Sequence, residues 1–430
     1  MRHARGMESS QDRIAKFPMG QVEFVALMAS MQALMALSID IMLPALGAIS
    51  KDLGVSDPNQ RQLVIGIFMI CAGFGSLFPG ALADRFGRRK VVLVAVAVYV
   101  LFAFICSIAG SFELLLAARA CLGFVTAAMM VMPMTILRDR YEGDMMARTQ
   151  SLVATTFMVV PMIAPMIGQA IMLVAGWRWI FGVTCAMGVL VFIWVFLRLP
   201  ETLRAENRQD IRPKVIFGNM ALALREKSAI GYFLGGALVQ AGMFGYLNSA
   251  QQLVGEALGA GTLFPILFGL MAMVMACSNF VNARIVVAFG ARRVSHAALI
   301  VFIVAAAVHL LVAMSGTETL WVFVPLMTVS MCMLSFIGSN FQAISLQPFA
   351  RIAGAAASVM SFVRMVLGSA LGAVIGLAYD GTAVPITASM TVFGVLAVLL
   401  VLYSEQGKLF RRVNPPEYYR KNQPQPTAPH

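Results

Sequence analysis

The sequence predicts an all-α integral membrane protein with twelve transmembrane helices in two pseudo-symmetric six-helix bundles. Three observations favour this fold class: charged residues are scarce, long apolar runs recur along the chain, and the two halves echo each other. Hydrophobic residues make up 60% of the 430 residues, and charged residues only 12%. Soluble domains carry about 25% charged residues, and a soluble protein of this composition would expose large apolar patches. A polytopic membrane protein is therefore expected.

Twelve apolar runs are long enough to cross a bilayer, which takes about 20 residues in a helix. They are longer than the strands of a membrane barrel, and backbone groups in hydrocarbon must be satisfied within the segment, so we expect helices. No apolar run precedes Val22, so no cleaved signal peptide is expected. The runs lie at 24–47, 63–83, 91–112, 114–137, 151–175, 179–197, 229–253, 262–283, 294–317, 320–346, 352–379 and 382–404.

Lys and Arg are distributed unevenly among the segments that connect these runs. Cytoplasmic loops carry an excess of both residues. If the N-terminus lies inside, only Lys51, Arg61 and Arg178 fall in outer loops, while Arg119 and Arg364 lie within runs. We therefore expect both termini in the cytoplasm, and the net charge of +12 then reflects orientation and implies no nucleic-acid partner.

A polar, charged segment in mid-chain separates two halves. Phe86-Gly87-Arg88-Arg89 after the second run is echoed by Phe289-Gly290-Ala291-Arg292-Arg293 after the eighth. Two similar halves with a substrate site between them are typical of a secondary transporter. The expected parts are a cytoplasmic N-terminal segment (1–23), a first bundle (24–197), a cytoplasmic linker (198–228), a second bundle (229–404) and a disordered cytoplasmic tail (405–430).

Asp40 is the only carboxylate that lies inside an apolar run and away from its ends. It lies about 25 Å along the helix from Glu23, and Arg119 lies about 9 Å from Glu113, so the two charged residues reach compatible depths. Burial disfavours an ionised carboxylate, and a nearby arginine favours it. We therefore expect Asp40 to bind and release a coupled proton. A static Asp40–Arg119 pair, or a cap near the outer interface, is the structural alternative.

Other polar residues inside the runs are candidates for a substrate cavity. Arg364 lies about 20 Å along the eleventh run from its inner end. It binds an anionic substrate or serves as a structural partner of a carbonyl or carboxylate, and both interpretations stay open. Each of the other candidates is, taken singly, more often an interhelical hydrogen bond: Gln32, Gln240, Tyr246, Asn248 and Asn340.

The motifs of several other chemistries are missing from the sequence. The six cysteines fall within apolar runs without CxxC spacing, which indicates buried apolar side chains rather than disulfides or metal ligands. The sequence contains no Walker A motif, metal-ligand cluster or nucleophile elbow. We expect no enzyme activity, no catalytic residue, no cofactor and no metal.

The loop between the second and third runs carries a specific motif. Residues 80–90, Gly-Ala-Leu-Ala-Asp-Arg-Phe-Gly-Arg-Arg-Lys, resemble the signature loop of the major facilitator superfamily. The resemblance implies the major facilitator fold and a loop that latches the cytoplasmic side and biases the inward/outward equilibrium. In this loop Gly80 permits close helix contact, and Asp84 can face a helix N-terminus or a basic group. The latch residues are Gly80, Asp84, Arg85, Gly87, Arg88 and Arg89.

Further motifs resemble those of 12-helix drug:proton antiporters, especially the Bcr/CflA drug-resistance family. Residues 40–46, Asp-Ile-Met-Leu-Pro-Ala-Leu, are similar to that family's motif at the end of helix 1. Arg119 with Gly123 resembles a helix 4 motif that the family uses in proton coupling, although Leu122 replaces the usual Gln. The helix 5 antiporter motif is matched by Pro161, Pro165 and Gly168, with Gln169 where a second Gly is usual, and Leu199-Pro200-Glu201-Thr202 after the sixth run is also typical.

These observations lead us to expect a proton-coupled antiporter of the bacterial inner membrane that exports amphipathic drugs or related small molecules by alternating access. Its expected partners are the small molecule, protons and the lipid bilayer, with no nucleic acid, and we expect a monomer. Three alternatives remain: a transporter of a defined metabolite, which is anionic if Arg364 binds it; a channel; and a membrane sensor.

Overall fold

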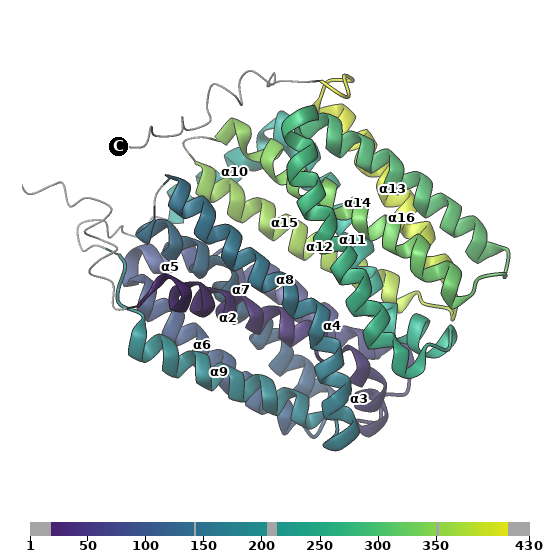
Figure 1. The fold of residues 1–430 in the computed structure, drawn as a ribbon, viewed down its shortest axis with the longest axis horizontal. Coiled ribbons are helices and arrows are strands. Elements are labelled where there is room, and N and C mark those ends of the chain that lie inside the picture. The colour runs from purple at the N-terminus through teal and green to yellow at the C-terminus, as the bar shows by residue number, and fades with distance from the viewer. Residues whose placement is uncertain (1–18, 142, 204–212, 350–351, 412–430) are drawn as a thin grey trace, which may run out of the picture. The chain divides into compact units, whose positions relative to one another are not determined.

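The computed structural model describes residues 19–141, 143–203, 213–349 and 352–411. Every regular element in these ranges is a helix, and no strand occurs among them (Figure 1). The all-α fold class is therefore confirmed. Most of the expected N-terminal segment and of the expected disordered tail lies outside the described residues.

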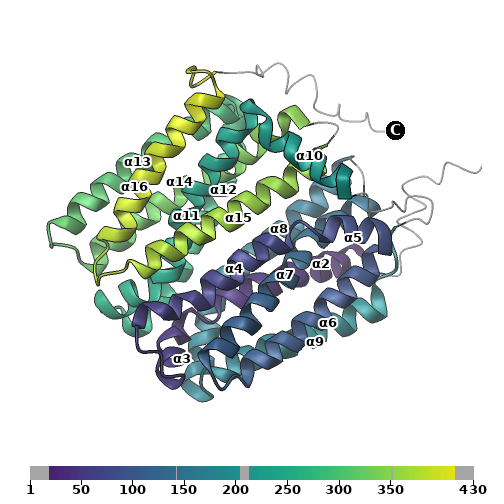
Figure 2. The ribbon, with the colours of Figure 1, turned by 180° about the vertical axis from the view of Figure 1, so that it is seen from behind.

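The chain forms two compact units. Unit 1 comprises Met1–Phe217, Leu247–Leu270 and Gly376–Ala378, and unit 2 comprises Gly218–Tyr246, Met271–Ile375 and Tyr379–His430. Within each unit the long helices run side by side, as two opposite views show (Figures 1 and 2). The bundle limits expected from the sequence stay a prediction.

Unit 1 contains the helices of the first half of the chain. It also holds two segments of the second half, Gly376–Ala378 and Leu247–Leu270. The latter contains the π-helix η4 (Gln251–Ala257) and the 3-10 helix η5 (Gly261–Leu263). Its other elements are α2 (Gln21–Asp40), η1 (Leu43–Ala45), α3 (Leu46–Asp52), η2 (Pro58–Gln62), α4 (Leu63–Gly75), α5 (Pro79–Phe86), α6 (Arg88–Ser107), α7 (Phe112–Arg140), α8 (Gly143–Val174) and α9 (Arg178–Arg198).

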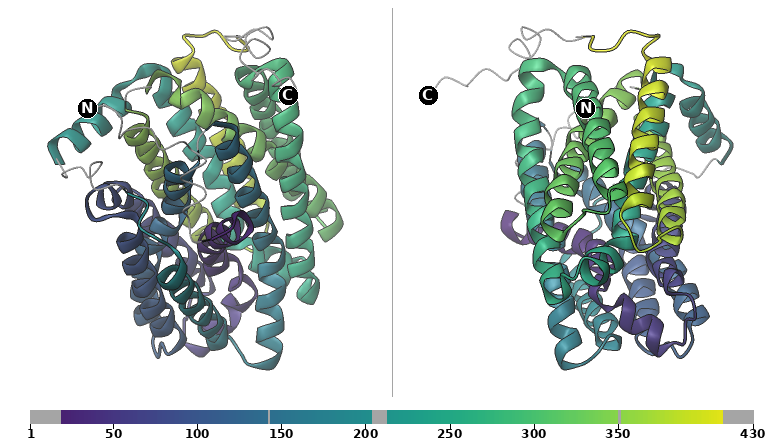
Figure 3. Two further views of the ribbon diagram at one scale, coloured as in Figure 1. Left: turned by 60° about the vertical axis from the view of Figure 1, so that its left-hand side comes forward. Right: turned by 90° about the vertical axis from the view of Figure 1, so that its right-hand side faces the viewer.

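Unit 2 contains most of the helices of the second half, and Figure 3 shows them from two sides. A helix, α10 (Pro213–Arg225), occupies part of the segment expected to be a linker. The elements that follow are α11 (Lys227–Ala250), α12 (Phe264–Phe289), α13 (Ala291–Met314), α14 (Leu320–Leu346), η6 (Gln347–Phe349), α15 (Ala353–Leu377) and α16 (Val384–Ser404).

These helices follow the twelve expected runs in order. Ten of the described helices are long and apolar enough to cross a membrane, and the bent pair Asn59–Gly75 and Pro79–Phe86 makes an eleventh if it is one span. The remaining expected run lies in α8, of which Val159–Val174 is a shorter apolar helix. Large apolar side chains such as Val174, Leu311 and Trp321 stay exposed on the helices, as is expected of surfaces that face lipid rather than water.

Proline interrupts the first two spans but not the fifth. α2 ends at Asp40, and Pro44, which has no backbone N–H to donate, lies in the first turn of the 3-10 helix that follows. The second span bends by 46° before Pro79. Pro161 and Pro165 lie inside α8, which continues through both.

Glycines bring helix backbones into contact within each unit, because a missing Cβ lets two helices approach closely. In unit 1, a Cβ on Gly123 would lie 2.1 Å from the carbonyl oxygen of Phe68, which joins α7 to α4. In unit 2, a Cβ on Gly372 would lie 2.6 Å from Cβ of Phe244, which joins α15 to α11. Both contacts therefore depend on glycine.

Candidate functional site

Asp40 is the last residue of α2, directly before the break in the first span. Only 7% of its surface is exposed, and its carboxylate forms no hydrogen bond or ion pair with any residue in the described part of the chain. The C-terminal end of a helix carries partial negative charge, which is unfavourable for an anion. Burial without a partner and this position both disfavour the ionised carboxylate.

Arg119 on α7 is fully buried and joins three helices. Its Nε donates to the carbonyl oxygen of Val64 on α4 at 3.0 Å, and its Nη1 donates to the carbonyl oxygen of Ser38 on α2 at 2.9 Å. Its guanidinium carbon lies 4.2 Å from the ring centroid of Phe68, at cation–π distance. The last four carbonyls of a helix have no partner within it, so Arg119 caps the C-terminus of α2.

The structure brings Asp40 and Arg119 to the same end of α2 without pairing them. Arg119 holds the carbonyl of Ser38, two residues before Asp40, and its Nη2 is buried without a hydrogen-bond partner. The static ion pair named as a structural alternative therefore does not form between these two described residues. The buried Nη2 group of Arg119 is therefore a hydrogen-bond donor without a partner in the described part of the chain, near the end of the helix α2 that carries Asp40.

Two hydroxyl groups complete this polar cluster. Ser38 donates to the carbonyl of Leu34 at 2.7 Å and shares a 2.7 Å hydrogen bond with the hydroxyl of Tyr99, a fully buried residue of α6. Sequence reasoning missed both residues. The available signal was weak: a serine two residues before Asp40, and a lone tyrosine within an apolar run, where a buried hydroxyl usually needs a partner.

The helix 5 motif touches the motif that contains Asp40. A Cβ on Gly168 of α8 would lie 1.8 Å from the carbonyl oxygen of Ile41 and 3.3 Å from Cγ of Pro44. Pro165, one turn earlier on α8, is also buried. The backbone contact at Gly168 thus holds α8 against the break in the first span.

The predicted latch loop forms a charged cluster around Arg88. Its Nη1 donates to Asp84 at 2.6 Å, its Nε donates to Asp139 at 3.1 Å, and its backbone N–H donates to Glu201 at 2.8 Å. Gly87 has a φ of +99°, and a Cβ there would lie 2.3 Å from Oε2 of Glu201, so the site needs glycine. Asp84 thus faces a basic group.

The other latch residues differ in their surroundings. Arg89 donates to the carbonyl oxygen of Phe196 at 2.7 Å, and the guanidinium of Arg85 lies 5.5 Å from the ring centroid of Phe86. No atom lies within 4 Å of a Cβ built on Gly80. The close helix contact expected at Gly80 is therefore not seen among the described residues.

Comparison with known proteins decides the family. Residues 28–373 match the Major Facilitator Superfamily. The chain belongs to this superfamily. Its resemblance to the superfamily is thus confirmed, and the protein is a membrane transporter rather than an enzyme.

Individual relatives agree with this assignment. The chain is 29% identical over 383 residues to a bicyclomycin resistance protein homolog of Haemophilus influenzae, a match that covers 87% of this chain and 94% of the relative. It is 29% identical over 373 residues to the multidrug resistance protein MdtL of Klebsiella pneumoniae, covering 84% and 91%. These names confirm the resemblance to Bcr/CflA-type drug-resistance transporters.

A solved structure shares the fold. The inward-facing, unoccupied structure of a bacterial homolog of the human lysosomal transporter Spinster superposes with a TM-score of 0.70, at 16% sequence identity. The match covers 95% of this chain and 99% of the Spinster homolog. At this identity the similarity concerns the fold alone.

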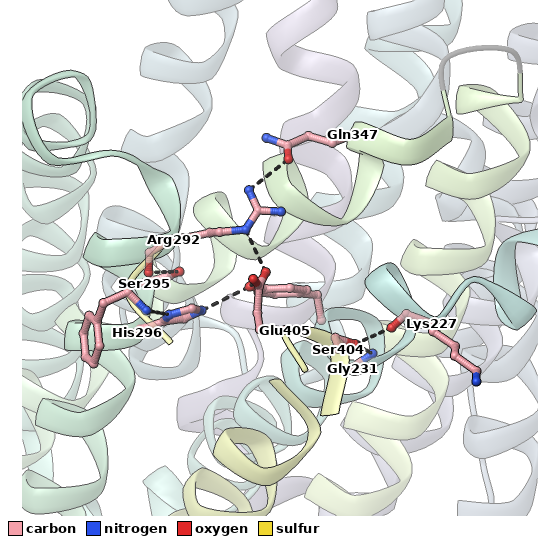
Figure 4. A network of polar contacts seen from close by, with 10 residues as sticks. Lys227, Gly231, Arg292, Ser295, His296, Gln347, Ser404 and Glu405 are labelled. Carbon is pink, nitrogen blue, oxygen red and sulfur yellow. Dashed lines mark hydrogen bonds and ion pairs between the residues drawn. The ribbon is translucent and has the colours of Figure 1, made fainter. Parts of the chain in front are cut away.

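The second half of this major facilitator protein also has a polar cluster near a glycine turn, and Figure 4 shows the part of it around Arg292 and Glu405. Gly290, which corresponds to Gly87, has a φ of +87°. Arg292 donates from Nε to Glu405 at 2.7 Å and from Nη1 to Gln347 at 3.1 Å. Glu405 directly follows α16, and Glu201 follows α9 after Leu199 and Pro200. In each half an arginine near the glycine turn therefore contacts a carboxylate beyond the last helix, Arg88 through its backbone N–H and Arg292 through its side chain.

Further hydrogen bonds surround Glu405 (Figure 4). The hydroxyl of Tyr232 donates to Glu405 at 2.7 Å and lies 3.1 Å from Nε2 of His296. The backbone N–H of Phe410 donates to Nδ1 of His296 at 3.1 Å. These contacts fasten the segment after α16 to α11 and α13.

The candidate cavity residues fall into different environments. Gln240 accepts a hydrogen bond from Nη2 of Arg364 at 3.1 Å, so these two are brought together. Asn340 donates to Asn282 of α12 at 2.8 Å, which is the interhelical hydrogen bond given as its structural alternative. The hydroxyl of Tyr246 donates to the sulfur of Met271 at 3.3 Å.

The remaining two candidates lie in unit 1. Asn248 is 1% exposed, and neither its amide nitrogen nor its amide oxygen has a hydrogen-bond partner among the described residues. Gln32 is partly buried on α2, about 12 Å along the helix from Asp40. The structure therefore joins only Gln240 and Arg364 of this set.

No group of three or more His, Cys, Asp or Glu residues in the described part of the chain is placed to hold a metal ion. The six cysteines are unpaired.

Proposed function

We propose that this protein is a proton-coupled antiporter that exports amphipathic small molecules by alternating access. Asp40 carries the proton, and Arg119 assists it. The protein acts as a monomer in the bacterial inner membrane with both termini in the cytoplasm. The printed names of the relatives, bicyclomycin resistance and multidrug resistance, support export of drug-like molecules.

The observation that carries this proposal is the unpaired Asp40 at the broken end of α2. A carboxyl group that is buried without a partner favours its neutral, protonated form, and it ionises more readily once water reaches it. A change in hydration between two states therefore converts into proton uptake and release. A permanent ion pair with Arg119 would oppose this cycle, and the structure has none.

Arg119 favours release of the proton without neutralising Asp40 permanently. Its Nε and Nη1 are held by backbone carbonyls, while Nη2 is free. A small movement at the break after Asp40 would let the ionised carboxylate accept a hydrogen bond from Nη2, and a charge-assisted bond of this kind is roughly twice as strong as a neutral one.

Coupling then follows from competition between two ligands for one protein. Substrate binds the inward-open state from the cytoplasm, and a proton from outside binds Asp40 after the substrate leaves. Each ligand shifts the conformational equilibrium only by its differential affinity for the two states. The proton gradient thereby drives export.

The test uses purified protein in liposomes with an imposed pH gradient. The probes are ethidium, chloramphenicol and 2-naphthoate, and a trapped pH-sensitive dye reports proton movement. We expect gradient-driven flux of at least one probe with the wild type, and Asp40→Asn to abolish the response to the gradient because an amide does not titrate.

The matched control is Glu113→Gln, which neutralises an exposed acid in the first turn of α7 and is expected to keep gradient-driven flux. Asp40→Asn flux that still follows the pH gradient would contradict the role of Asp40. Wild-type flux that ignores the gradient for every probe would contradict proton coupling.

A further inference from the structure

We infer that Arg364 and Gln240 bind an acidic group of the substrate, so that the molecules transported include amphipathic organic anions. This inference rests on the proposed export function, which it extends by naming a chemical class of substrate. The acidic group is a carboxylate or an anion of similar size. The argument starts from the position of Arg364 in its helix.

Arg364 lies near the middle of α15. It is about 17 Å along the helix from Ala353 and about 20 Å from Leu377. A guanidinium at this depth is costly, so such residues face protein or water and usually pair with an opposite charge. A partner of opposite charge is therefore expected for Arg364 at this position.

The only hydrogen bond of Arg364 within the described part of the chain is to a neutral group. Its Nη2 donates to the side-chain oxygen of Gln240 on α11 at 3.1 Å, and Nε and Nη1 make no hydrogen bond there. An amide orients the guanidinium but leaves its charge uncompensated. Arg364 is only partly buried, and its free donors are not among the sealed polar atoms, in contrast to Nη2 of Arg119.

The described carboxylates of unit 2 are engaged elsewhere. Glu405 binds Arg292 and Tyr232, and Glu318 binds His309 at 2.6 Å. Glu226 accepts hydrogen bonds from Ser228, and Asp380 accepts them from Thr382. None of these four is an ion-pair partner of Arg364, so this arginine has no counter-ion from the described part of unit 2.

Two glycines of neighbouring helices lie beside the side chain of Arg364. A Cβ on Gly338 of α14 would lie 3.8 Å from Nη2 of Arg364, and a Cβ on Gly236 of α11 would lie 3.9 Å from its Cδ. Larger side chains on these two helices would crowd the arginine. The guanidinium of Arg364 is oriented by an amide, lies beside glycines and has no carboxylate partner among the described residues. These features suit an anion-binding subsite, since a guanidinium binds a carboxylate through two parallel hydrogen bonds.

The test measures equilibrium binding to purified protein in phosphatidylcholine nanodiscs, with no gradient. The probes are 2-naphthoate, 2-naphthamide and 2-naphthylmethylammonium, which share one ring system and differ in charge. We expect the wild type to bind naphthoate more tightly than naphthamide. Arg364→Gln should lower the ratio of naphthoate affinity to naphthamide affinity about tenfold or more, since hydrogen bonds to charged groups are this strong.

A second variant keeps the test decisive if Arg364→Gln fails to fold. Gln240→Glu has the shape of the wild-type side chain and supplies an internal counter-ion to Arg364, so it should also lower the naphthoate preference. The control is Arg284→Gln, which removes an exposed charge from α12 and should keep the wild-type ratio.

Either of two results would overturn the inference. The first is a naphthoate-to-naphthamide ratio that stays at the wild-type value in folded Arg364→Gln or Gln240→Glu. The second is a wild type that binds naphthoate no more tightly than naphthamide. Phosphatidylglycerol that co-purifies with the wild type but not with Arg364→Gln would then assign the arginine to a lipid headgroup.

This assay is independent of proton coupling. An Arg364-dependent preference for naphthoate together with flux that ignores the pH gradient would support the substrate class and contradict the proposed antiport. Gradient-driven flux of ethidium or chloramphenicol without any anion preference would support the proposed antiport and contradict the substrate class.

Discussion

Arg119 directs its guanidinium to backbone carbonyls rather than to a carboxylate. Two of its nitrogens hold the carbonyls of Ser38 and Val64, and the third is sealed without a partner. A lysine has one compact ammonium group in place of the planar guanidinium with its several N–H donors. The residue therefore has a structural role that its type and position in the sequence do not reveal, alongside the proposed role in proton release.

Arg119→Lys is expected to lower the free energy of unfolding by about 2 kcal/mol, because one ammonium cannot hold both carbonyls and each hydrogen bond to a charged group is worth about 1.5–3 kcal/mol. Thermal unfolding of the purified protein measures this loss. Arg138→Lys, at an exposed position on the same helix, should change stability by less than about 0.5 kcal/mol. Equal effects of the two substitutions would contradict the capping role.

At the scale of elements, the break after Asp40 organises the candidate site. Pro44 has no backbone N–H for the carbonyl of Asp40, and α2 ends at Asp40. The carbonyl of Ser38, one of the last four of α2, accepts from Arg119 instead of from a following turn. Gly168 places α8 directly against the carbonyl of Ile41 at the same break. Three motifs that are far apart in the sequence thus meet at one helix end.

Gly168→Ala is expected to separate α8 from the break in the first span, because its Cβ would lie 1.8 Å from the carbonyl oxygen of Ile41. Overpacking of a tight contact typically costs about 1–3 kcal/mol. Thermal unfolding and gradient-driven flux should both decline. Gly182→Ala on α9 is the control, since its Cβ would meet only Trp179 at an ordinary 3.6 Å. An unaltered Gly168→Ala protein would show that the backbone contact is not needed.

At the scale of the whole molecule, the distribution of basic residues determines the expected orientation. The latch arginines Arg88 and Arg89 and their second-half counterparts Arg292 and Arg293 lie in segments expected on the cytoplasmic side. Arg88, Arg292 and Arg293 bind chain segments that follow the last helix of each half, and Arg89 binds the carbonyl of Phe196 in the last turn of α9. The same residues therefore favour one membrane orientation and stabilise local structure.

Fusion reporters test this orientation. Green fluorescent protein fused after residue 430 should fluoresce in bacterial cells, and alkaline phosphatase fused there should be inactive, because the phosphatase needs an oxidising exterior for its disulfides. A phosphatase fusion in the expected outer loop after Gly54 should be active and serves as the control. Active phosphatase at the C-terminus would reverse the predicted topology.

The membrane class, the order of the helices and the superfamily could all be predicted from the sequence. The length of an apolar run and the residues of a contiguous motif are local properties, so they can be recognised without knowing how the chain folds. The sequence also singled out Asp40, Arg119 and Arg364, because charge inside an apolar run is rare and costly. The partners of these side chains are known only from the folded protein: Arg119 binds carbonyls of α2 and α4, Tyr99 hydrogen-bonds Ser38, and Arg364 binds an amide instead of a carboxylate. Such pairings depend on which helix faces come together, and that is set by packing between segments far apart in the chain.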